Sequence, residues 1–543
     1  MRLVIVGDTL LDRDVDGSVT RIAPDAPAPV LDEENVHERP GGAGLAALLA
    51  ARHGQPVTLV TALAADAAGA RLSELLTAAG ITVYALPLPG RTPEKIRMRA
   101  GGQVLLRLDR GGPPQPPGDA PAAVLEVLRE ATAILVSDYG RGVAGHPALR
   151  AALTEAKAPV VWDPHPNGPS PVPGVRLVTP NESEARRLAG DAGHGSGLST
   201  AQRTGHTLRQ RWKAGAVVVT RGSSGAVLCQ GGPSPLVVPV PAASGGDTCG
   251  AGDAFAVAAA VALAGGALVS EAVEAAVHEA SAYVAGLYDM YEISGRREER
   301  DRTAPLGQAR PRPDGGSAGG RRGDGPAGGR PDGGSAGGRP DGGSAGGRPG
   351  DASAGGRLDG GYGGVRPGGG FTGERPGGGN AGGGDGDGYA GSGDAGRLAA
   401  AVRARGGTVV ATGGCFDLLH TGHLATLRAA RSLGDCLVVL LNSDDSVRRL
   451  KGADRPLTGQ DDRARLLAAL DCVDAVVIFG EPTPEPVLTW LRPDIWVKGG
   501  DYADGGPDLP ESAVVERWGG QTVIVPYLDG RSTTRTIAEA RGR

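Results

Sequence analysis

Short β-branched runs alternate with longer segments of helical periodicity over residues 1–295. The runs have the length and composition of β-strands, and the segments between them are rich in Ala, Leu, Glu and Arg. This alternation predicts a doubly wound α/β domain built on a mainly parallel sheet. The expected strands lie in RLVIVG from Arg2, PVTLVTAL from Pro56, AILVSDYG from Ala133, PVVWDP from Pro159, VRLVTPN from Val175 and AVVVTRG from Ala216.

Residues 395–543 repeat this alternation on a smaller scale. The pattern predicts a second, smaller α/β domain of Rossmann-like character. Its strands are expected in TVVATGG from Thr408, CLVVLLNSD from Cys436, AVVIFG from Ala475, IWVKGG from Ile495 and QTVIVPY from Gln521.

The segment between these domains, residues 296–394, lacks such periodicity, and the nonapeptide PDGGSAGGR occurs in it at Pro313, Pro331 and Pro340. Such a sequence buries too little apolar surface to offset the entropy of ordering, so a disordered tether is expected. A flexible coil of about a hundred residues would span roughly 50–60 Å. The alternative is an arginine–glycine arm that binds RNA, although its arginines alternate with aspartates and its aromatic residues are few.

The composition of the chain limits the classes of protein to which it can belong, but it does not indicate a reaction. The chain has 543 residues, enough for two or three domains, and many of its 93 glycines lie in the central segment. The formal net charge of −5 gives no overall bias toward nucleic acid or an anionic membrane. The five cysteines are scattered without CxxC spacing, which indicates reduced thiols in a cytoplasm rather than a disulfide framework or a zinc site.

Membrane insertion and export are not expected. The N-terminus MRLVIVGDTLLD lacks a basic region followed by a long apolar core, and is typical of a buried strand running into a turn rather than of a signal peptide. The longest apolar stretch, residues 255–269, is shorter than the roughly 20 residues that a spanning helix needs. The pattern therefore predicts a soluble protein.

A glycine-rich turn before an alanine-rich helix carries the first candidate chemistry. In the sequence GAGD, Gly250, Ala251 and Gly252 can point their backbone N–H groups at one place beside a helix N-terminus, which suits a phosphate. Asp253 stands next to that place and can accept a proton from an attacking hydroxyl; loss of such a base typically costs about 10²–10⁴-fold in rate. A helix start with a capping aspartate would have the same sequence, so further motifs must decide.

The second candidate lies in GGCFDLLHTGH, which begins at Gly413. His420 and His423 are three residues apart at an expected helix N-terminus, so both can point the same way, and Gly422 lets a nucleotide approach the backbone. Imidazoles there can hydrogen-bond phosphate oxygens as charge develops. The alternatives are a metal pair or two structural histidines, and no nearby Cys/His cluster supplies further metal ligands.

Other motifs accompany GAGD in the first domain: GDTLLD at Gly7, ERPGGAGLAA at Glu38, TPNESE at Thr179 and TRGSSG at Thr220. Together they resemble the ribokinase-like (PfkB) carbohydrate kinases over nearly all of residues 1–295. The resemblance implies that Asp253 is the catalytic base and that the GAGD turn is an anion hole. It also implies residues that organise Mg²⁺ and phosphate, residues that bind ATP and residues that bind the sugar: Asn181 and Glu184; Thr220, Gly222 and Gly225; Asp12, Gly41 and Gly42.

The second domain adds NSDDSVRRLKG, RPLTGQDDRARLL, LRPDIWVKGGDY and GRSTTRTI to its histidine motif. The set resembles the cytidylyltransferase-like nucleotidyltransferases over almost all of residues 405–540. The resemblance implies that His420 and His423 stabilise the reacting α-phosphate and the pyrophosphate leaving group. The other residues that it implies to contact the nucleotide or its phosphates are Lys451, Arg463, Gly414, Phe416, Ser532, Thr533 and Thr534.

The two motifs differ in a way that bears on their substrates. The GAGD motif contains a carboxylate base, as a hydroxyl nucleophile needs, whereas the histidine motif offers no equivalent candidate. A phosphate monoester is already anionic and needs no base. The first domain should therefore phosphorylate a hydroxyl, and the second should attach a nucleotide to an existing phosphate.

The domain order and several stretches, including VSDYGRG, RLKGADRPL and PDIWVKGGDY, resemble the bifunctional heptose enzymes of ADP-heptose synthesis. The resemblance implies Mg²⁺- and ATP-dependent phosphorylation of D-glycero-β-D-manno-heptose 7-phosphate at O1, then removal of the 7-phosphate by a separate phosphatase. Adenylyl transfer from ATP to the heptose 1-phosphate would follow. The expected partners are these small molecules in the cytoplasm, without membrane or nucleic acid, and a homo-oligomer is left open.

Two positions depart from that family's pattern. Leu45 stands where the family usually has Asn and cannot hydrogen-bond a sugar, and His165 stands where a Lys often follows the DP dipeptide. Both lie on the expected sugar or 7-phosphate side of the kinase site. The alternative is therefore another sugar kinase fused to a cytidylyltransferase for a polyol or sugar phosphate. A scaffold of two degenerate domains is disfavoured, because the candidate catalytic residues are all present.

Overall fold

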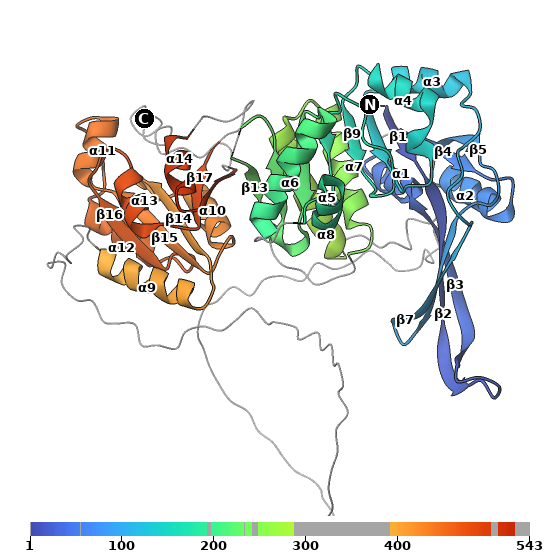
Figure 1. Cartoon of the computed structure of the whole chain (residues 1–543), viewed down its shortest axis with the longest axis horizontal. Helices are drawn as coiled ribbons and strands as arrows, with labels where there is room; N and C mark the ends of the chain where they lie inside the picture. Colours follow the sequence, from blue (N-terminus) through green and yellow to red (C-terminus); the bar gives the residue numbers. More distant parts are fainter. Residues whose placement is uncertain are drawn as a thin grey trace, which may run out of the picture. The chain divides into compact units, whose positions relative to one another are not determined.

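The computed structural model describes residues 2–54, 56–192, 197–232, 234–241, 248–286, 391–500 and 509–526 (Figure 1). The predicted tether, residues 296–394, lies outside the described residues except for its last four. Helix α9 (Ser392–Ala404) begins within those four residues, ahead of the predicted boundary at residue 395.

A mainly parallel sheet forms the centre of the first domain, and each strand expected from the sequence is part of it. In spatial order its strands are β13 (Leu236–Val238), β12 (Ala226–Cys229), β11 (Ala216–Thr220), β10 (Leu177–Val178), β9 (Val160–Asp163), β8 (Ala133–Ser137), β1 (Leu3–Gly7), β4 (Val57–Leu63) and β5 (Thr82–Pro87). Only the pairings of β12 with β11 and with β13 are antiparallel within this set.

Helices cover both faces of this sheet, which explains why β1 is apolar without alternation. Leu3 and Ile5 pack into a core with α1, α7 and α8, whereas Val4 and Val6 pack into a core with α3, α4 and α6. The helices and single 3₁₀ turns are α1 (Ala43–Arg52), α2 (Ala67–Ala78), α3 (Ala122–Arg129), η1 (Val143–Gly145), α4 (Pro147–Thr154), α5 (Glu182–Ala189), α6 (Gly197–Trp212), η2 (Gly222–Ser224), α7 (Ala251–Ala264) and α8 (Val269–Val284).

A second sheet, which we call the lid sheet, extends from this domain and was not predicted (Figure 1). The GDTLLD motif does not end in a turn as expected, because a long strand begins at Thr9 and carries Asp12 within it. Its charged and glycine residues have low strand propensity, and cross-strand pairing overrides that preference. The strands in order are β3 (Pro29–Gly42), β2 (Thr9–Ile22), β6 (Glu94–Ala100) and β7 (Gln103–Arg110).

The second domain has a parallel sheet that contains each of its expected strands. Helix α9 packs on one face through Ala399 and Val402, and α10 and α12 pack on the other through Leu427 and Leu467. The strands in order are β16 (Ala475–Phe479), β15 (Cys436–Asn442), β14 (Val409–Gly414), β17 (Ile495–Gly499) and β18 (Gln521–Val525). The remaining helices are α10 (Thr421–Arg431), α11 (Asp444–Lys451), α12 (Gln460–Ala468), α13 (Glu485–Leu491) and α14 (Pro510–Glu516).

Each sheet reverses its strand order beside its first strand. β1 lies between β4 and β8, and β14 lies between β15 and β17, with all these pairs parallel. At such a switch point the loops leave the carboxyl ends of neighbouring strands in opposite directions, which leaves a crevice for a ligand. Asp8 and Asp138 follow β1 and β8 at the first switch point, and the histidine motif follows β14 at the second.

Candidate active sites

The aspartate predicted as the kinase base is buried near the start of α7. Asp253 is 5% exposed, and its Oδ2 accepts a hydrogen bond from Tyr139 Oη at 2.9 Å. Its Oδ1 accepts no hydrogen bond from a described residue. Burial raises the pKa of Asp253 to about 7, although the Tyr139 hydroxyl and the charge of Lys95 oppose this rise. The carboxylate therefore ionises near neutral pH and has one oxygen available for a proton.

The GAGD turn forms the start of α7 as predicted. Gly250 has φ 92°, in the left-handed region that favours glycine, and a Cβ there would lie 2.6 Å from Tyr283 Oη. A Cβ on Gly252 would meet no described atom within 4 Å, so the helix start is open there. The Ala251 N–H differs from the expectation, because it donates to Thr248 O at 3.1 Å. Gly250 and Gly252 remain the better candidates for phosphate donors.

The predicted sugar ligands meet where β3 of the lid sheet joins α1. Asp12 Oδ1 accepts a hydrogen bond from Arg97 Nη1 at 3.1 Å. A Cβ on Gly41 would come within 2.5 Å of Asp12 Oδ2, so the glycine lets this carboxylate lie close to the backbone. Gly42 caps α1, and a Cβ there would lie 3.4 Å from Tyr139 Cδ2. The ring of Tyr139 therefore lies between the predicted sugar ligands and Asp253.

Asp8 fixes the loop that carries Tyr139, a role that the sequence analysis missed. Its Oδ2 accepts hydrogen bonds from the backbone N–H groups of Tyr139 at 3.2 Å and Arg141 at 2.8 Å. Its Oδ1 accepts one from the N–H of Val143 at 3.0 Å. The loop after β8 is thus tied to the end of β1 across the switch point.

Two further acidic side chains at strand ends were also missed. Burial raises the pKa of Asp138 to about 7. Burial and the nearby charges of Asp253 and Glu184 raise the pKa of Asp163 well above its ordinary value. Asp163 accepts a hydrogen bond from Thr179 Oγ1 at 2.8 Å. The detectable signal was an Asp at the end of successive apolar runs, since the carboxyl ends of parallel strands share one edge of the sheet.

Lys95 brings a positive charge from the lid sheet to this site. Its Nζ lies 5.6 Å from the centroid of the Tyr139 ring. It also helps to lower the pKa of His165, which burial lowers most and Asp8 partly restores. A neutral His165 does not supply the cation that a sugar phosphate would need, whereas Lys95 can supply one.

Leu45, the other departure from the heptose-enzyme pattern, packs against the anion turn. It is 5% exposed, and a Cβ on Gly250 would lie 3.0 Å from its Cδ2. The position at which the family usually has a hydrogen-bonding Asn therefore lies beside the turn that is expected to hold the transferred phosphate.

The two predicted nucleotide motifs of the kinase domain are adjacent. Asn181 forms a β-bridge with Thr220, and these residues begin the N-x-x-E and T-x-G-x-x-G motifs. Asn181 and Glu184 also form the capping box of α5, with reciprocal backbone-to-side-chain hydrogen bonds of 2.9 Å. Gly222 and Gly225 follow in the turn around η2. The structure brings together residues 39 positions apart in the chain.

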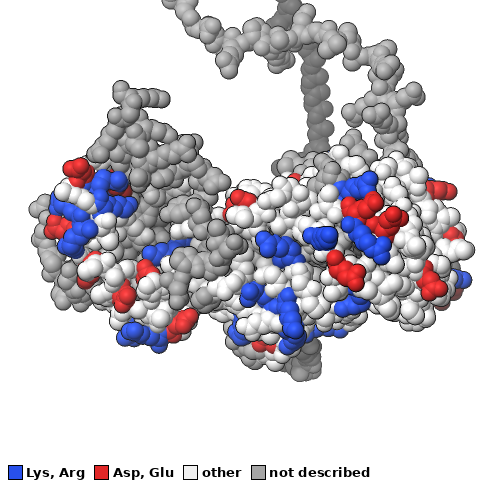
Figure 2. Space-filling view, turned by 90° about the horizontal axis from the view of Figure 1, so that it is seen from above, with Lys and Arg blue, Asp and Glu red and all other residues white. Residues whose placement is uncertain are grey.

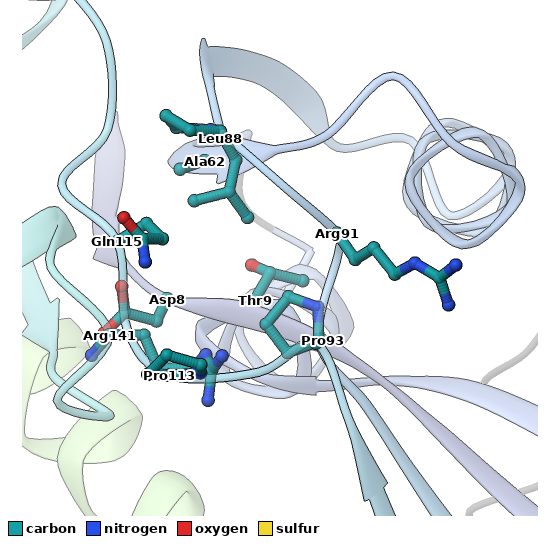
Figure 3. A pocket seen from close by; sticks show the side chains of 11 residues that line it. Asp8, Thr9, Ala62, Leu88, Arg91, Pro93, Pro113, Gln115 and Arg141 are labelled. Atoms are coloured by element: carbon teal, nitrogen blue, oxygen red, sulfur yellow. The ribbon is translucent and has the colours of Figure 1, made fainter.

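A small pocket lies beside Asp8 and Thr9 (Figure 3). Its volume is about 10 Å³, room for roughly one water molecule, so it is too small for a sugar or nucleotide. Figure 3 shows the Arg91 side chain pointing away from the other lining residues, and Arg141 Nη2 donates to Gly112 O at 2.9 Å. This pocket is not the substrate site in the described form.

In the second domain the candidate catalytic residues converge. His420 caps α10, and its Nδ1 accepts a hydrogen bond from the His423 N–H at 3.4 Å. The two rings are stacked, with centroids 3.9 Å apart. Burial, with His420 and Lys451 nearby, lowers the pKa of His423 to about 4, so this imidazole is neutral at pH 7. Lys451, the last residue of α11, is exposed and free to reach an anion.

Phe416 supports the histidines rather than lining an open surface. It is 7% exposed, its φ of 44° is unusual for a bulky residue, and its ring centroid lies 5.2 Å from that of His423. A Cβ on Gly414 would lie 3.1 Å from Phe416 Cε2, so glycine leaves room for the ring. Both residues shape the floor of the site after β14.

The position of Arg463 differs from that expected of a phosphate ligand. It is 1% exposed, and its guanidinium is engaged by protein groups from the loops around the site. A direct contact with phosphate would require it to leave these partners, so its role in this form is to hold the loops. The acceptors are Thr458 O, Cys415 O, Asn442 O and Asp444 Oδ1.

Asp417, inside the histidine motif, is also occupied by protein. Its Oδ1 accepts hydrogen bonds from the N–H groups of Leu457 at 2.7 Å and Thr458 at 3.1 Å, and its Oδ2 pairs with Arg455. Burial alone would raise the pKa of Asp417, but these hydrogen bonds and the arginine lower it. The other expected triphosphate residues, Ser532 to Thr534, lie outside the described residues.

Comparison with known proteins identifies both domains. The pfkB family carbohydrate kinases match residues 1–289, and the cytidylyltransferase-like family matches residues 411–517. The bifunctional protein HldE of Streptomyces coelicolor is 46% identical over 539 residues, which is 99% of this chain and 96% of that protein. The chain belongs to the HldE family of bifunctional proteins. The kinase and nucleotidyltransferase assignments made from the motifs are confirmed.

Similarity to HldE proteins extends to other bacteria. The HldE of Geobacter sulfurreducens is 32% identical over 98% of this chain and 94% of that protein. Among solved structures, the tetrameric inhibited form of phosphofructokinase-2 from Escherichia coli is 20% identical over 54% of this chain and 96% of that chain, with a TM-score of 0.43.

Proposed function

We propose that this HldE-family chain phosphorylates O1 of D-glycero-β-D-manno-heptose 7-phosphate with ATP and, in its second domain, transfers AMP from ATP to the heptose 1-phosphate. The contrast between the two sites carries the proposal. Asp253 offers an unpartnered carboxylate oxygen at a phosphate-binding helix start, whereas both oxygens of Asp417 in the histidine motif are held by protein groups. The first arrangement suits a hydroxyl nucleophile, and the second suits one that is already anionic.

In the kinase step, Asp253 Oδ1 takes the proton of the sugar hydroxyl while that oxygen attacks the γ-phosphorus of ATP. The bond between the γ-phosphorus and the bridging oxygen breaks, and ADP leaves. The helix start at Gly250 and Gly252 stabilises the charge that develops on the transferred group. Asp12 orients the sugar by accepting hydrogen bonds from the hydroxyl groups of the sugar.

Mg²⁺ fits the acidic side of this site. The negative charge of Glu184 helps to raise the pKa of Asp163, which shows that the two carboxylates repel each other. A divalent cation with its waters would relieve that repulsion, and Mg²⁺ usually needs only one or two carboxylates besides phosphates and water. Glu184, helped by Asn181, would hold the ion and its waters beside the ATP phosphates. When bound, the ion supplies neutralisation of phosphate charge.

In the transferase step, a phosphate oxygen of the sugar 1-phosphate attacks the α-phosphorus of ATP and pyrophosphate leaves. His420 and His423 hydrogen-bond the α-phosphate and the leaving group, and Lys451 adds positive charge beside them. The neutral state of His423 permits it to donate a hydrogen bond without repelling Lys451. The residues of 532–534 complete the triphosphate site in this proposal.

The two steps require a separate phosphatase, because the kinase product still carries the 7-phosphate that the transferase substrate lacks. We place the enzyme in the cytoplasm, where ATP is abundant. Among the described residues, no helix combines the length and apolar character that crossing a bilayer requires. On the face shown in Figure 2, acidic and basic side chains lie in small interspersed groups, which gives nucleic acid no extended basic surface there.

A homo-oligomer formed through the lid sheet is part of the proposal. Cross-strand pairing places Val36, Val15, Met98 and Leu106 in one row on the face opposite Asp12. Val36 is 41% and Leu106 is 55% exposed. Exposed apolar rows of this kind favour an identical row on a second copy. Sedimentation should show a larger species for the native chain than for Leu106→Glu.

The test of the proposed function is ³¹P NMR of the purified chain with Mg-ATP. Heptose 7-phosphate should give a new anomeric phosphate signal, and β-heptose 1-phosphate should give an ADP-sugar and pyrophosphate. Turnover of the second substrate alone would show that the kinase prefers another sugar, with Leu45 and His165 as the first positions to examine. Turnover with CTP but not ATP would replace the adenylyltransferase by the cytidylyltransferase alternative.

A further inference from the structure

Tyr139 donates a hydrogen bond to one oxygen of the carboxylate proposed as the kinase base, and the hydroxyl of Ser137 lies near that carboxylate. Tyr139 Oη lies 2.9 Å from Asp253 Oδ2, while Asp253 Oδ1 has no partner among the described residues. A carboxylate held in this way presents only one oxygen to a substrate. We propose that Tyr139 is a positioning residue of the kinase reaction: its hydroxyl orients Asp253 so that Oδ1 receives the proton of the attacking sugar hydroxyl.

Tyr139 is itself anchored from several directions. Its backbone N–H donates to Asp8 Oδ2 at 3.2 Å, which ties it to the end of β1. Its ring lies against Gly42 beside the predicted sugar ligands, and Lys95 Nζ of the lid sheet lies 5.6 Å from the ring centroid. A tyrosine with these contacts keeps its hydroxyl at a fixed place relative to both the sugar ligands and the base.

The hydroxyl is a donor at every working pH. Burial, together with the charges of Asp253 and Asp163, raises the pKa of Tyr139 well above 10.0. The groups that face Asp253 are Tyr139 and Ser137 from the β8 end, Lys95 from β6, Asp12 from β2 and Asp163 from β9. A hydrogen bond to the ionised carboxylate favours ionisation, so its loss makes Asp253 a base only at higher pH.

The experiment is Tyr139→Phe in the full chain, measured beside Tyr84→Phe, which removes a hydroxyl from another half-buried tyrosine of the same domain. Tyr139→Phe should lower the kcat of phosphorylation about tenfold and leave KM for the sugar phosphate within about twofold. The acid limb of its kcat–pH profile should move to higher pH. Tyr84→Phe and the adenylyl transfer rate of both variants should match the native chain.

An unshifted acid limb with native kcat in Tyr139→Phe overturns the proposal, and so does an equal effect in Tyr84→Phe. If Tyr139→Phe fails to fold, 3-fluorotyrosine at position 139 serves instead: it keeps the volume and donates more strongly, so the acid limb should move to lower pH. The inference rests on Asp253 as the base, and Asp253→Asn separates the two ideas. If Asp253→Asn still phosphorylates the sugar, Asp253 is not the base. If Asp253→Asn is inactive but Tyr139→Phe behaves as the native chain, only the proposed role of Tyr139 is wrong.

Discussion

Asp253 has to be ionised to accept a proton, yet weakly solvated to act close to the substrate. Its burial at the start of α7 raises the pKa to about 7, which places the base near physiological pH. General bases are most effective when their pKa lies near the working pH. The pKa of the residue proposed as the kinase base is therefore set by its surroundings rather than by its residue type.

The kcat of phosphorylation should rise with pH with a midpoint near 7, because only the ionised Asp253 accepts the proton. Below pH 6 it should fall about tenfold for each further unit. Rates measured at saturating sugar phosphate and Mg-ATP, with adenylyl transfer by the same chain as the control, test this. A kinase profile that is flat between pH 6 and 8 would contradict the assignment of Asp253.

At the scale of residues, the sequence predicted the local helix starts that carry the candidate site residues. The GAGD turn starts α7 and His420 caps α10, as their local spacing implied. It missed Tyr139, Asp8 and Lys95, because their roles depend on contacts with distant parts of the chain. Arg463, which the family resemblance implies to bind phosphate, is buried in the structure, and its guanidinium donates to loop carbonyls and to Asp444.

At the scale of elements, the loop after α11 depends on the strand–helix junction that carries the histidines. Asp417 holds Leu457 and Thr458 by their N–H groups and pairs with Arg455. These contacts tie the loop that follows Lys451 to the junction that carries His423. A buried ion pair, rather than apolar packing, therefore holds this loop in place.

Asp417→Asn should destabilise the transferase domain by about 3 kcal/mol, because breaking a buried pair leaves Arg455 uncompensated. The matched control is Asp454→Asn, an exposed aspartate of the same loop. Calorimetry of the full chain should show this lower stability in the unfolding transition that coincides with the loss of adenylyl transfer activity. The pKa of Asp417 is lowered in the fold, so the native advantage should vanish as pH falls below 3.8. Equal stability of the two variants at pH 7 would contradict this account.

The buried strands of both sheets could be predicted, whereas the lid sheet could not. Apolar runs such as LVIVG report burial on both faces regardless of the partner strand. In β2 and β6 one face carries Asp12, Asp14 and Lys95, so the apolar signal is diluted by the site itself. The residues of these strands pair with residues of strands that are distant in the chain, and local composition does not encode the register of that pairing.

On the scale of the whole molecule, the two sites should be separable. Asp253→Asn should lower phosphorylation by about 10²–10⁴-fold and leave adenylyl transfer near normal. His423→Ala should lower adenylyl transfer by about 10²–10³-fold and leave phosphorylation near normal. Each variant is the folding control for the other, with both activities assayed on one preparation. A folded variant that lost both activities would contradict the two-site assignment.

Deleting residues 313–348, which contain the PDGGSAGGR repeats, should leave each kcat within about threefold. The intermediate must leave the kinase for a phosphatase before the transferase can use it, so no direct hand-over depends on the tether length. Steady-state assays of the two half-reactions check this. A large loss in either would give the segment a catalytic or assembly role.

Local sequence determined the domain types, the buried strands and the helix starts at the two candidate phosphate-binding motifs, because consecutive backbone groups and helix spacing act over a few residues. Tertiary structure decided which side chains meet. Tyr139 and Asp253 are 114 residues apart and share a hydrogen bond only because β8 ends beside the start of α7. Burial then set the pKa of Asp253, engaged Arg463 and brought Lys95 over Tyr139. Such contacts depend on sheet order and register, which place distant residues together through many weak interactions.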